Sequence, residues 1–285
     1  MSQAYQDACI IIPTKHAKSV AIAPPFREKL GASVLEHVVD TDTLGTFSGE
    51  VERKGNALEC ARRKCAWALE LLGSKTDYVL ASEGSFGPHP HIPFLPCDQE
   101  TLYFMDRERG FHLHLSLTSE KTNYQMKLLG SLEELQTFAK AAQFPSHALI
   151  LRPNGSETRS PIFKGLNTEA ALADAFSDAL KLSSAGKVWV ETDMRAQMNP
   201  SRMAVIGELA SQLAIRLATA CPQCSAPGWG RVRAEKGLEC EYCDQTTEMI
   251  ANEIYGCVLC DHSEKIPRTD GLKAAPQQHC GWCNP

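Results

Sequence analysis

The fold of the C-terminal part is decided by four short segments: CPQC (221–224), CEYC (240–243), CVLC (257–260) and CGWC (280–283). Each segment places two cysteine sulfurs on one tight turn, and two segments together can close a tetrahedral thiolate shell around Zn²⁺. Intervals of 15, 13 and 19 residues separate them, and such spacings are typical of zinc ribbons. The sequence therefore predicts two structural zinc ions held by Cys221, Cys224, Cys240, Cys243, Cys257, Cys260, Cys280 and Cys283.

Disulfide bonds are the alternative use of these cysteines. The chain opens MSQAYQDACIII, a start without the basic region, long apolar core and cleavage site of a secretion signal. No apolar run approaches the roughly 18 residues that a membrane span needs. We therefore expect a cytoplasmic protein without a membrane segment, in a compartment that keeps thiols reduced.

The sequence constrains which segments share a zinc ion less than it constrains their role as zinc ligands. We expect neighbours in sequence to pair, so that 221–224 joins 240–243 and 257–260 joins 280–283. A crossed arrangement is the alternative. In either case a shell of four cysteines is closed and serves the structure, because no coordination position is left open for a substrate.

Charge argues against a general nucleic-acid role for this zinc module. From Cys221 onward the chain has six Lys or Arg against nine Asp or Glu. With eight thiolates and two Zn²⁺ the module would carry a net charge of about −7. Proteins that grip nucleic acid need a basic face to displace phosphate counterions, so we disfavour nucleic acid as a partner.

Residues 1–219 are predicted to form an α/β domain, and residues 220–285 the zinc module. The domain is expected to hold a mixed sheet with flanking helices and one antiparallel hairpin turning at 107–110. Strands are predicted at 8–12, 33–39, 77–82, 100–104, 111–117, 148–151 and 187–192. Helices are predicted at 56–72, 131–142, 168–182 and from Asn199, which caps a helix with Pro200 in its first position.

Polar residues that follow the predicted strands are the candidates for chemistry, because ligands of open α/β sheets gather at the carboxyl ends of strands. Carboxylates from separate loops could hold Mg²⁺, and basic side chains could meet a phosphate. The expected catalytic or metal-binding acids are Glu50, Glu52, Glu83 and Asp193. The expected substrate-binding residues are Lys15, Lys18, Ser85, Arg195 and Arg202.

Each candidate also has a structural interpretation. Lone lysines in loops are usually solvated, which applies to Lys15 and Lys18. Asp193 could instead form an ion pair with Arg195 or Arg202. Glu83 directly follows the predicted strand YVLAS and precedes a glycine, so we expect it at a strand tip, where a functional role is as well supported as a structural one.

Two resemblances bear on these residues. The stretches VVDTDTLGTFSGEVERKGNALECARRKCAWAL (38–69), ASEGSFGPHP (81–90) and ETDMRAQMNPSRM (191–203), with the tail ending CGWCNP, resemble a family of uncharacterised bacterial proteins over the whole chain. A Thr/Lys loop after the first strand, an acidic lead into an NAL-containing helix, and a strand ending in Glu83-Gly84 make the first 120 residues similar to the inosine/xanthosine triphosphate pyrophosphatase fold.

The second resemblance implies a Mg²⁺-dependent enzyme that removes pyrophosphate from non-standard nucleotides. It implies that Lys18 binds phosphate, that Glu50 or Glu52 binds the metal, and that Glu83 is the acid after the central strand. Our leading hypothesis is therefore a Mg²⁺-dependent hydrolase acting on a nucleotide or another phosphorylated small molecule. The alternative is a binding protein whose zinc module contacts a protein or nucleic acid, with the α/β body as its scaffold.

Overall fold

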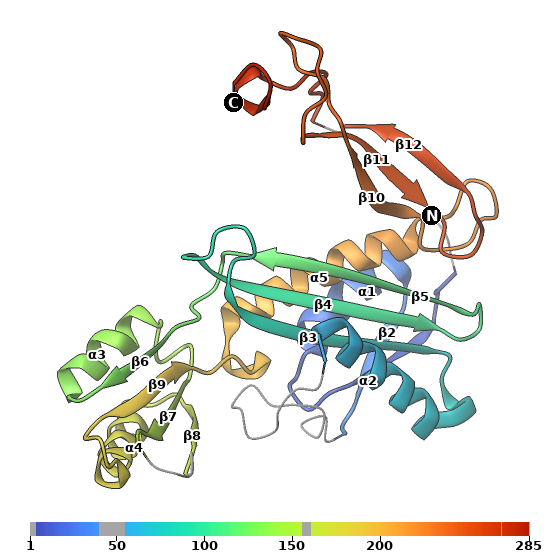
Figure 1. Cartoon of the computed structure of the whole chain (residues 1–285). Coiled ribbons are helices and arrows are strands. Elements are labelled where there is room, and N and C mark those ends of the chain that lie inside the picture. The colour runs from blue at the N-terminus through green and yellow to red at the C-terminus, as the bar shows by residue number, and fades with distance from the viewer. Residues whose placement is uncertain (1–3, 40–54, 156–160, 269, 285) are drawn as a thin grey trace. The chain divides into compact units, whose positions relative to one another are not determined.

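The computed structural model describes residues 4–39, 55–155, 161–268 and 270–284. The chain forms two compact units (Figure 1). The first, Asp7–Leu213, is called the α/β unit below. The second, called the cysteine unit, comprises Ala214–Pro285 and the described N-terminal residues up to Gln6. The chain passes from one unit to the other within a single helix, α5 (Pro200–Ala218).

A five-stranded mixed sheet is the centre of the α/β unit. Its strands are β1 (Cys9–Pro13), β2 (Ser33–His37), β3 (Tyr78–Pro88), β4 (Pro96–Asp106) and β5 (Phe111–Ser119), arranged in the order β2-β1-β3-β4-β5. The first three strands in this order run parallel, and β3, β4 and β5 form an antiparallel meander. The predicted fold class, an α/β protein with a mixed sheet and an antiparallel hairpin, is confirmed.

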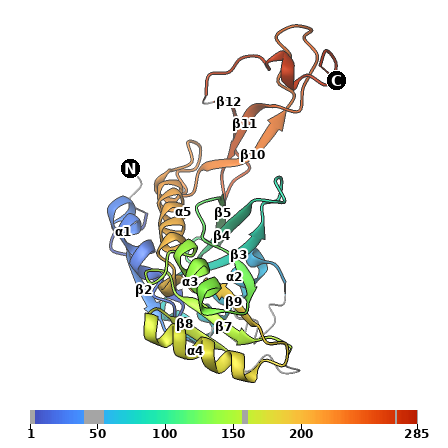
Figure 2. The same cartoon turned by 90° about the vertical axis from the view of Figure 1, so that its left-hand side faces the viewer.

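Helices cover both faces of this sheet (Figure 2). Helix α2 (Ala57–Leu72) begins at Asn56, whose side chain forms a reciprocal capping box with Glu59, and continues into a short 3-10 turn, η2 (Gly73–Lys75). Its small residues Ala61 and Ala68 pack on Val79, Ala81 and Tyr103 of the sheet. On the other face lie α1 (Ser19–Leu30) and α5, which approach each other closely at the glycine in position 207.

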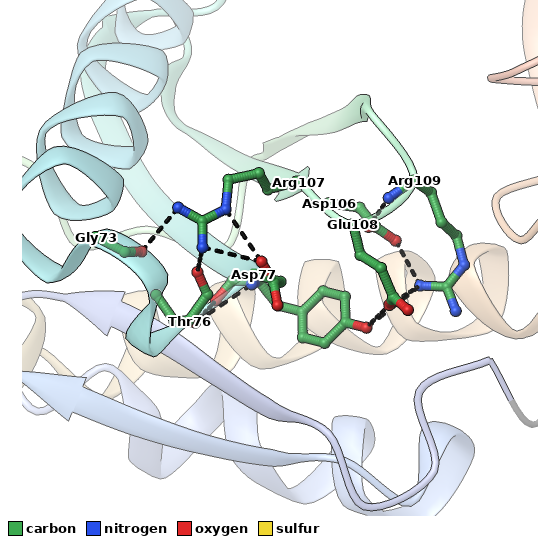
Figure 3. A network of polar contacts seen from close by, with 8 residues as sticks. Gly73, Thr76, Asp77, Asp106, Arg107, Glu108 and Arg109 are labelled. Atoms are coloured by element: carbon green, nitrogen blue, oxygen red, sulfur yellow. Dashed lines mark hydrogen bonds and ion pairs between the residues drawn. The ribbon is translucent and has the colours of Figure 1, made fainter.

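The predicted hairpin turn at 107–110 is confirmed, and it is tied to the end of helix α2 (Figure 3). The Arg107 guanidinium donates hydrogen bonds to the carbonyl oxygens of Gly73 and Thr76, both at 2.7 Å, and forms an ion pair with Asp77 at 2.9 Å. Arg109 forms a second ion pair with Asp106 at 3.0 Å. These bonds fix the turn against the chain that enters β3.

Strand β3 is longer than the sequence pattern predicts. It continues to Pro88 because β4 pairs with it over its whole length, from Tyr78–Asp106 to Pro88–Pro96. Our expectation that Glu83 lies at a strand tip is therefore wrong. Glu83 lies in the middle of the strand, opposite Thr101.

A second, antiparallel sheet with its own core completes the α/β unit. Its strands are β6 (Met126–Leu129), β7 (Leu149–Pro153), β8 (Phe163–Leu166) and β9 (Val188–Thr192), in the order β6-β9-β7-β8. Helices α3 (Leu132–Ala141) and α4 (Glu169–Leu182) pack on it, with Leu135, Phe138, Leu172 and Phe176 buried in the core. The sequence pattern identified β7 and β9 but not the four-residue strands β6 and β8.

Helix α5 begins at its predicted cap, after a 3-10 turn, η3 (Ala196–Met198). The Asn199 side chain accepts a hydrogen bond from the Arg202 backbone N–H at 3.0 Å and donates one to Asn123 at 2.8 Å. Asn199 is fully buried. This bonding fixes the direction in which the first turn of α5 presents its side chains.

The cysteine unit contains a three-stranded antiparallel sheet. Its strands are β10 (Gly230–Lys236), β11 (Ile250–Gly256) and β12 (Ser263–Pro267), followed by a short 3-10 turn, η4 (Gln277–His279). Among the described helices of the whole chain, none has the length and apolar character needed to cross a bilayer.

Candidate functional site

The eight C-terminal cysteines form two tetrads, each with its sulfur atoms within 4.8 Å of one another. In the first, sulfur pairs lie 3.8 Å (Cys221–Cys260) and 3.6 Å (Cys224–Cys257) apart. In the second, the Cys243 sulfur lies 3.6 Å from that of Cys280. Four sulfurs placed tetrahedrally about 2.3 Å from a zinc ion would be separated by about 3.8 Å. Both tetrads therefore have the dimensions of a metal site and could hold ions such as Zn²⁺.

The tetrads combine the four segments in crossed order, so the expected pairing of neighbours in sequence is wrong. Segment 221–224 joins 257–260, and 240–243 joins 280–283. The sheet register explains the difference. Gly230 at the start of β10 pairs with Gly256 at the end of β11, which brings the first and third segments to the same end of the sheet. A parallel bridge between Cys240 and Ala275 brings the second and fourth together.

Backbone amides in these segments favour the thiolate form. The N–H groups of Leu259 and Cys260 donate to the Cys257 sulfur at 3.3 and 3.4 Å. Burial by itself would raise the pKa of Cys257, but these hydrogen bonds lower it to about 7. Hydrogen bonds from the N–H groups of Cys283 and Trp282 lower the pKa of Cys280 to about 6. Because metals bind thiolates, this geometry prepares the segments 257–260 and 280–283 for an ion.

The α/β unit contains a second group of functional candidates, which we call the buried charge cluster. It consists of three basic and three acidic side chains from β3, β4, α2, α5 and the loop before α1: Lys18, Lys64, Arg202, Glu83, Asp98 and Glu100. All of these side chains except that of Lys64 belong to buried residues. So many buried charges need mutual compensation, and such groups concentrate at functional sites.

One side of the cluster lies on the face of the sheet that α5 covers. Gly84 and Phe86 of β3 are paired with Glu100 and Asp98 of β4, so these four residues share that face. Arg202 reaches it from α5, and its Nε donates to Glu100 Oε1 at 2.6 Å. The Arg202 guanidinium carbon also lies 5.1 Å from the centre of the Phe86 ring. Position 84 has no room for a side chain, because the ends of Arg202 and Glu100 occupy the space next to the glycine.

The other side of the cluster lies on the face covered by α2. There Glu83 forms an ion pair with Lys64. Lys18 lies beside β3, beyond the point where β1 pairs with that strand. Its ammonium donates to the carbonyl oxygen of Ser82 at 2.7 Å and to the hydroxyl of Ser82 at 3.2 Å. Lys18 interacts electrostatically with both Glu83 and Glu100, so it connects the two sides.

Burial shifts the proton affinities in this cluster. Burial and the charge of Arg202 together lower the pKa of Lys18 to about 7, against the raising effect of Glu100 and Glu83. Burial and the neighbouring Glu100 carboxylate raise the pKa of Asp98 to about 8. For Glu83 burial would raise the pKa, but the charges of Lys64 and Lys18 lower it below its usual range. Glu83 is therefore ionised and Asp98 protonated at neutral pH.

The structure brings three of the predicted site residues together, because Lys18, Glu83 and Arg202 all belong to the buried charge cluster. Asp193 and Arg195 instead form an ion pair with each other, with Arg195 Nη2 2.6 Å from Asp193 Oδ2.

The remaining candidates are Lys15, Ser85, Glu50 and Glu52. Lys15 is exposed, and Ser85 is half-buried on the same face of β3 as Glu83. Glu50 and Glu52 lie outside the described residues. The assigned roles of these residues and of the Asp193–Arg195 pair stay predictions.

Three members of the cluster were not predicted. Asp98 and Glu100 carry a recognisable signal, since two acids at a spacing of two in the strand PCDQETLYFMD point to the same face. Lys64 lies between Ala61 and Ala68 in the apolar stripe of helix α2, where an unpaired charge would be costly. Each signal indicates a buried charge, but neither identifies its partner.

Comparison with known proteins identifies one family. The sequence profile of a domain of unknown function (DUF6671) matches residues 64–285. The match includes both cysteine tetrads and every member of the buried charge cluster except Lys18. A search of curated proteins finds no significant match. None of these findings supports the resemblance of the N-terminal part to the inosine/xanthosine triphosphate pyrophosphatase fold.

Proposed function

Because the chain belongs to the DUF6671 family, whose function is unknown, its activity has to be inferred from its own side chains, and we propose a Mg²⁺-dependent hydrolase. Its substrate is a nucleotide or another phosphorylated small molecule, bound at the buried charge cluster. The observation that carries this proposal is the meeting of Lys18, Arg202 and Glu83 in one buried network, because the three come from distant parts of the chain.

The charges of the cluster suit an anionic substrate. Lys18, Lys64 and Arg202 supply three positive groups. Arginine and lysine are the side chains that bind phosphate, and their attraction for it is strengthened when water is excluded. With Asp98 protonated, the acids Glu83 and Glu100 balance two of these three groups, and the third, Lys18, has a pKa of about 7 and is therefore partly charged at neutral pH. The surplus positive charge supports binding of a phosphate group.

The acids suit hydrolysis of that substrate. Glu83 is ionised, so its carboxylate can accept a proton from the attacking water. The water oxygen then forms a bond to phosphorus while the bond from phosphorus to the leaving oxygen breaks, and Lys18 stabilises the charge that develops on the phosphate. When bound, Mg²⁺ would supply polarisation of a phosphoryl oxygen.

The test is a panel of nucleoside triphosphates and simpler phosphate esters, assayed with Mg²⁺ for release of pyrophosphate or phosphate. We expect turnover by the natural chain and a loss of about 100-fold or more in E83Q, because a positioned general base contributes roughly 10²- to 10⁴-fold. E70Q makes the same change at an exposed residue of helix α2 and should retain activity.

Stability measurements make this result interpretable. E83Q removes one partner of the ion pair with Lys64, so its unfolding midpoint must be measured together with its activity. K18Q is a second variant, which leaves the Lys64–Glu83 ion pair in place. A folded natural chain that turns over none of the substrates would refute the proposal. Equal activity of E83Q and E70Q would remove Glu83 from the reaction.

We propose that the cysteine unit is a structural module that binds two zinc ions, and that the eight reduced thiols belong to a cytoplasmic protein. The sulfur–sulfur distances support zinc, and shells of four cysteines leave no position for a substrate. Loss of either ion is expected to unfold part of the unit, because the binding energy of structural zinc is folding energy.

A second candidate function, binding of a protein partner, is supported by two aromatic side chains on the second tetrad. Tyr242 and Trp282 each precede the last cysteine of their segment and are 74% and 77% exposed. Glu239 and Asp244 flank the segment 240–243, and Glu241 lies within it. Exposed aromatic rings among negative charges suit Lys or Arg side chains through cation–π contacts. We propose a basic peptide segment as the partner of this surface.

Binding of this partner can be tested with the zinc-loaded full chain. A Lys/Arg-rich peptide should bind, and a Glu-rich peptide should not. W282A should weaken binding, whereas L259A, at the equivalent position of the first tetrad, should not. Equal affinity of the two variants, or preferential binding of a single-stranded oligonucleotide, would contradict the proposed partner.

A further inference from the structure

Two acids of the buried charge cluster have oxygens without hydrogen-bond donors. Both side-chain oxygens of Asp98 and the Oε2 atom of Glu100 are buried and accept no hydrogen bond from the described residues. Asp98 and Glu100 are both 0% exposed. They lie on the same face of β4, two residues apart, and their carboxyl groups interact directly. Buried polar atoms without partners are rare in proteins, and an ion that belongs at the position is one explanation.

The other buried acids nearby are already engaged. Glu83 pairs with Lys64. Asp193 receives hydrogen bonds on both oxygens, from Arg195 Nη2 at 2.6 Å and the Gly165 backbone N–H at 3.1 Å on Oδ2, and from Arg195 Nε at 3.0 Å on Oδ1. Asp98 and Glu100, by contrast, keep three buried carboxylate oxygens that accept no hydrogen bond from the described residues.

We propose that Asp98 and Glu100 bind a divalent cation of the Mg²⁺ or Mn²⁺ type. Such hard cations take oxygen ligands, and Mg²⁺ is usually held by only one or two carboxylates, with water and substrate phosphate completing its shell. The site therefore needs no third protein acid.

The neighbouring bases place the substrate beside this cation. Arg202 binds Glu100 Oε1, and Lys18 interacts electrostatically with both Glu100 and Arg202. A phosphate group that contacts the metal is therefore within the field of both bases. The inference deepens the proposed hydrolase and rests on it for the chemistry of the ligand, but the metal site itself can be measured without any substrate.

The test uses the zinc-loaded full chain and Mn²⁺ alone, with free Mn²⁺ measured by electron paramagnetic resonance. The cysteine tetrads do not compete, because thiolates select zinc over manganese. D98N should weaken Mn²⁺ binding by roughly tenfold or more, since even residues that only orient a metal ligand change affinity by about 10- to 100-fold. D193N is the matched control, because Asp193 is equally buried but fully engaged.

A second measurement connects the metal to the phosphate. Inorganic phosphate should tighten Mn²⁺ binding to the natural chain, and K18Q should remove that tightening. Because K18Q also removes a positive charge that acts on Glu100, it should not weaken binding of Mn²⁺ alone. By linkage, Mn²⁺ must tighten phosphate binding by the same factor. E100Q supplies a second ligand variant in case D98N fails to fold.

The outcomes separate this inference from the proposed function. Equal Mn²⁺ affinity in the natural chain, D98N and E100Q would overturn the metal site even if nucleotide hydrolysis were observed. Selective loss of Mn²⁺ binding in D98N, combined with no turnover of any substrate, would support the metal site and reject the hydrolase. Failure of the natural chain to bind Mn²⁺ would also overturn the metal site.

Discussion

Gly84→Ala tests whether the buried Arg202–Glu100 pair is as closely packed as the structure indicates. A Cβ atom at position 84 would lie 2.5 Å from Arg202 Nη2 and 2.6 Å from Glu100 Oε1. Both distances are almost 1 Å shorter than ordinary van der Waals contact. Ends of flexible side chains can usually move away, but both of these side chains are 0% exposed and bonded to each other at 2.6 Å.

The expected loss of stability follows from these contacts. Forcing an extra methyl group into a packed interior costs about 1–3 kcal/mol, and breaking a buried ion pair costs about 3–5 kcal/mol. Because the pair can shift without separating completely, we expect the free energy of unfolding to fall by about 2–4 kcal/mol, between these two limits. For a unit of this size that corresponds to a decrease in melting temperature of roughly 5–15 °C.

The assay is urea unfolding of the full zinc-loaded chain, monitored by circular dichroism. G87A is the matched control, because Gly87 lies on the same strand and a Cβ there meets nothing within 4 Å. That control should be neutral or slightly stabilising, since glycine weakens strands. Unchanged zinc content would place the effect in the α/β unit. If G84A were as stable as G87A, the close approach of Arg202 and Glu100 to β3 would be refuted.

Two further predictions concern the metal tetrads and the buried acids. C243S/C283S should lose about one zinc ion per chain, because both residues belong to one tetrad, whereas C243S/C260S should lose about two; zinc analysis of the purified variants checks this, and loss of about two ions from both variants, the result expected if neighbouring segments paired, would contradict the crossed pairing. In metal-free buffer, the natural chain should lose stability relative to D98N as the pH rises from about 4 to 7, by at most about 1.4 kcal/mol per pH unit. The reason is that the folded chain keeps Asp98 protonated up to a pKa of about 8, far above its ordinary value of 3.8. Lys18, whose pKa of about 7 lies at the upper end of this range, is present in both proteins, so its titration largely cancels in the comparison. Parallel stability curves for the two proteins, from urea titrations at each pH, would contradict the raised pKa.

Local patterns were sufficient to predict many of the elements. The Asn56 cap, the apolar stripe of helix α2 and the Asn199-Pro200 start of helix α5 depend on residues within a few positions of one another. The same holds for the four Cys-x-x-Cys segments. The lengths of strands were less predictable, because β3 extends past Glu83 only by pairing with β4, and that pairing is a contact between distant residues.

The four Cys-x-x-Cys segments were enough to predict two groups of four cysteines that could hold metal ions, because each segment is a local turn whose two sulfurs lie close together wherever the turn is placed. Which segments share a tetrad depends on the tertiary structure, because the register between β10 and β11 brings the segments 221–224 and 257–260 together. The same is true of the buried charge cluster. Arg202 lies about a hundred positions along the chain from Asp98 and Glu100, and the energy of a buried charge depends on neighbours that only the folded chain supplies.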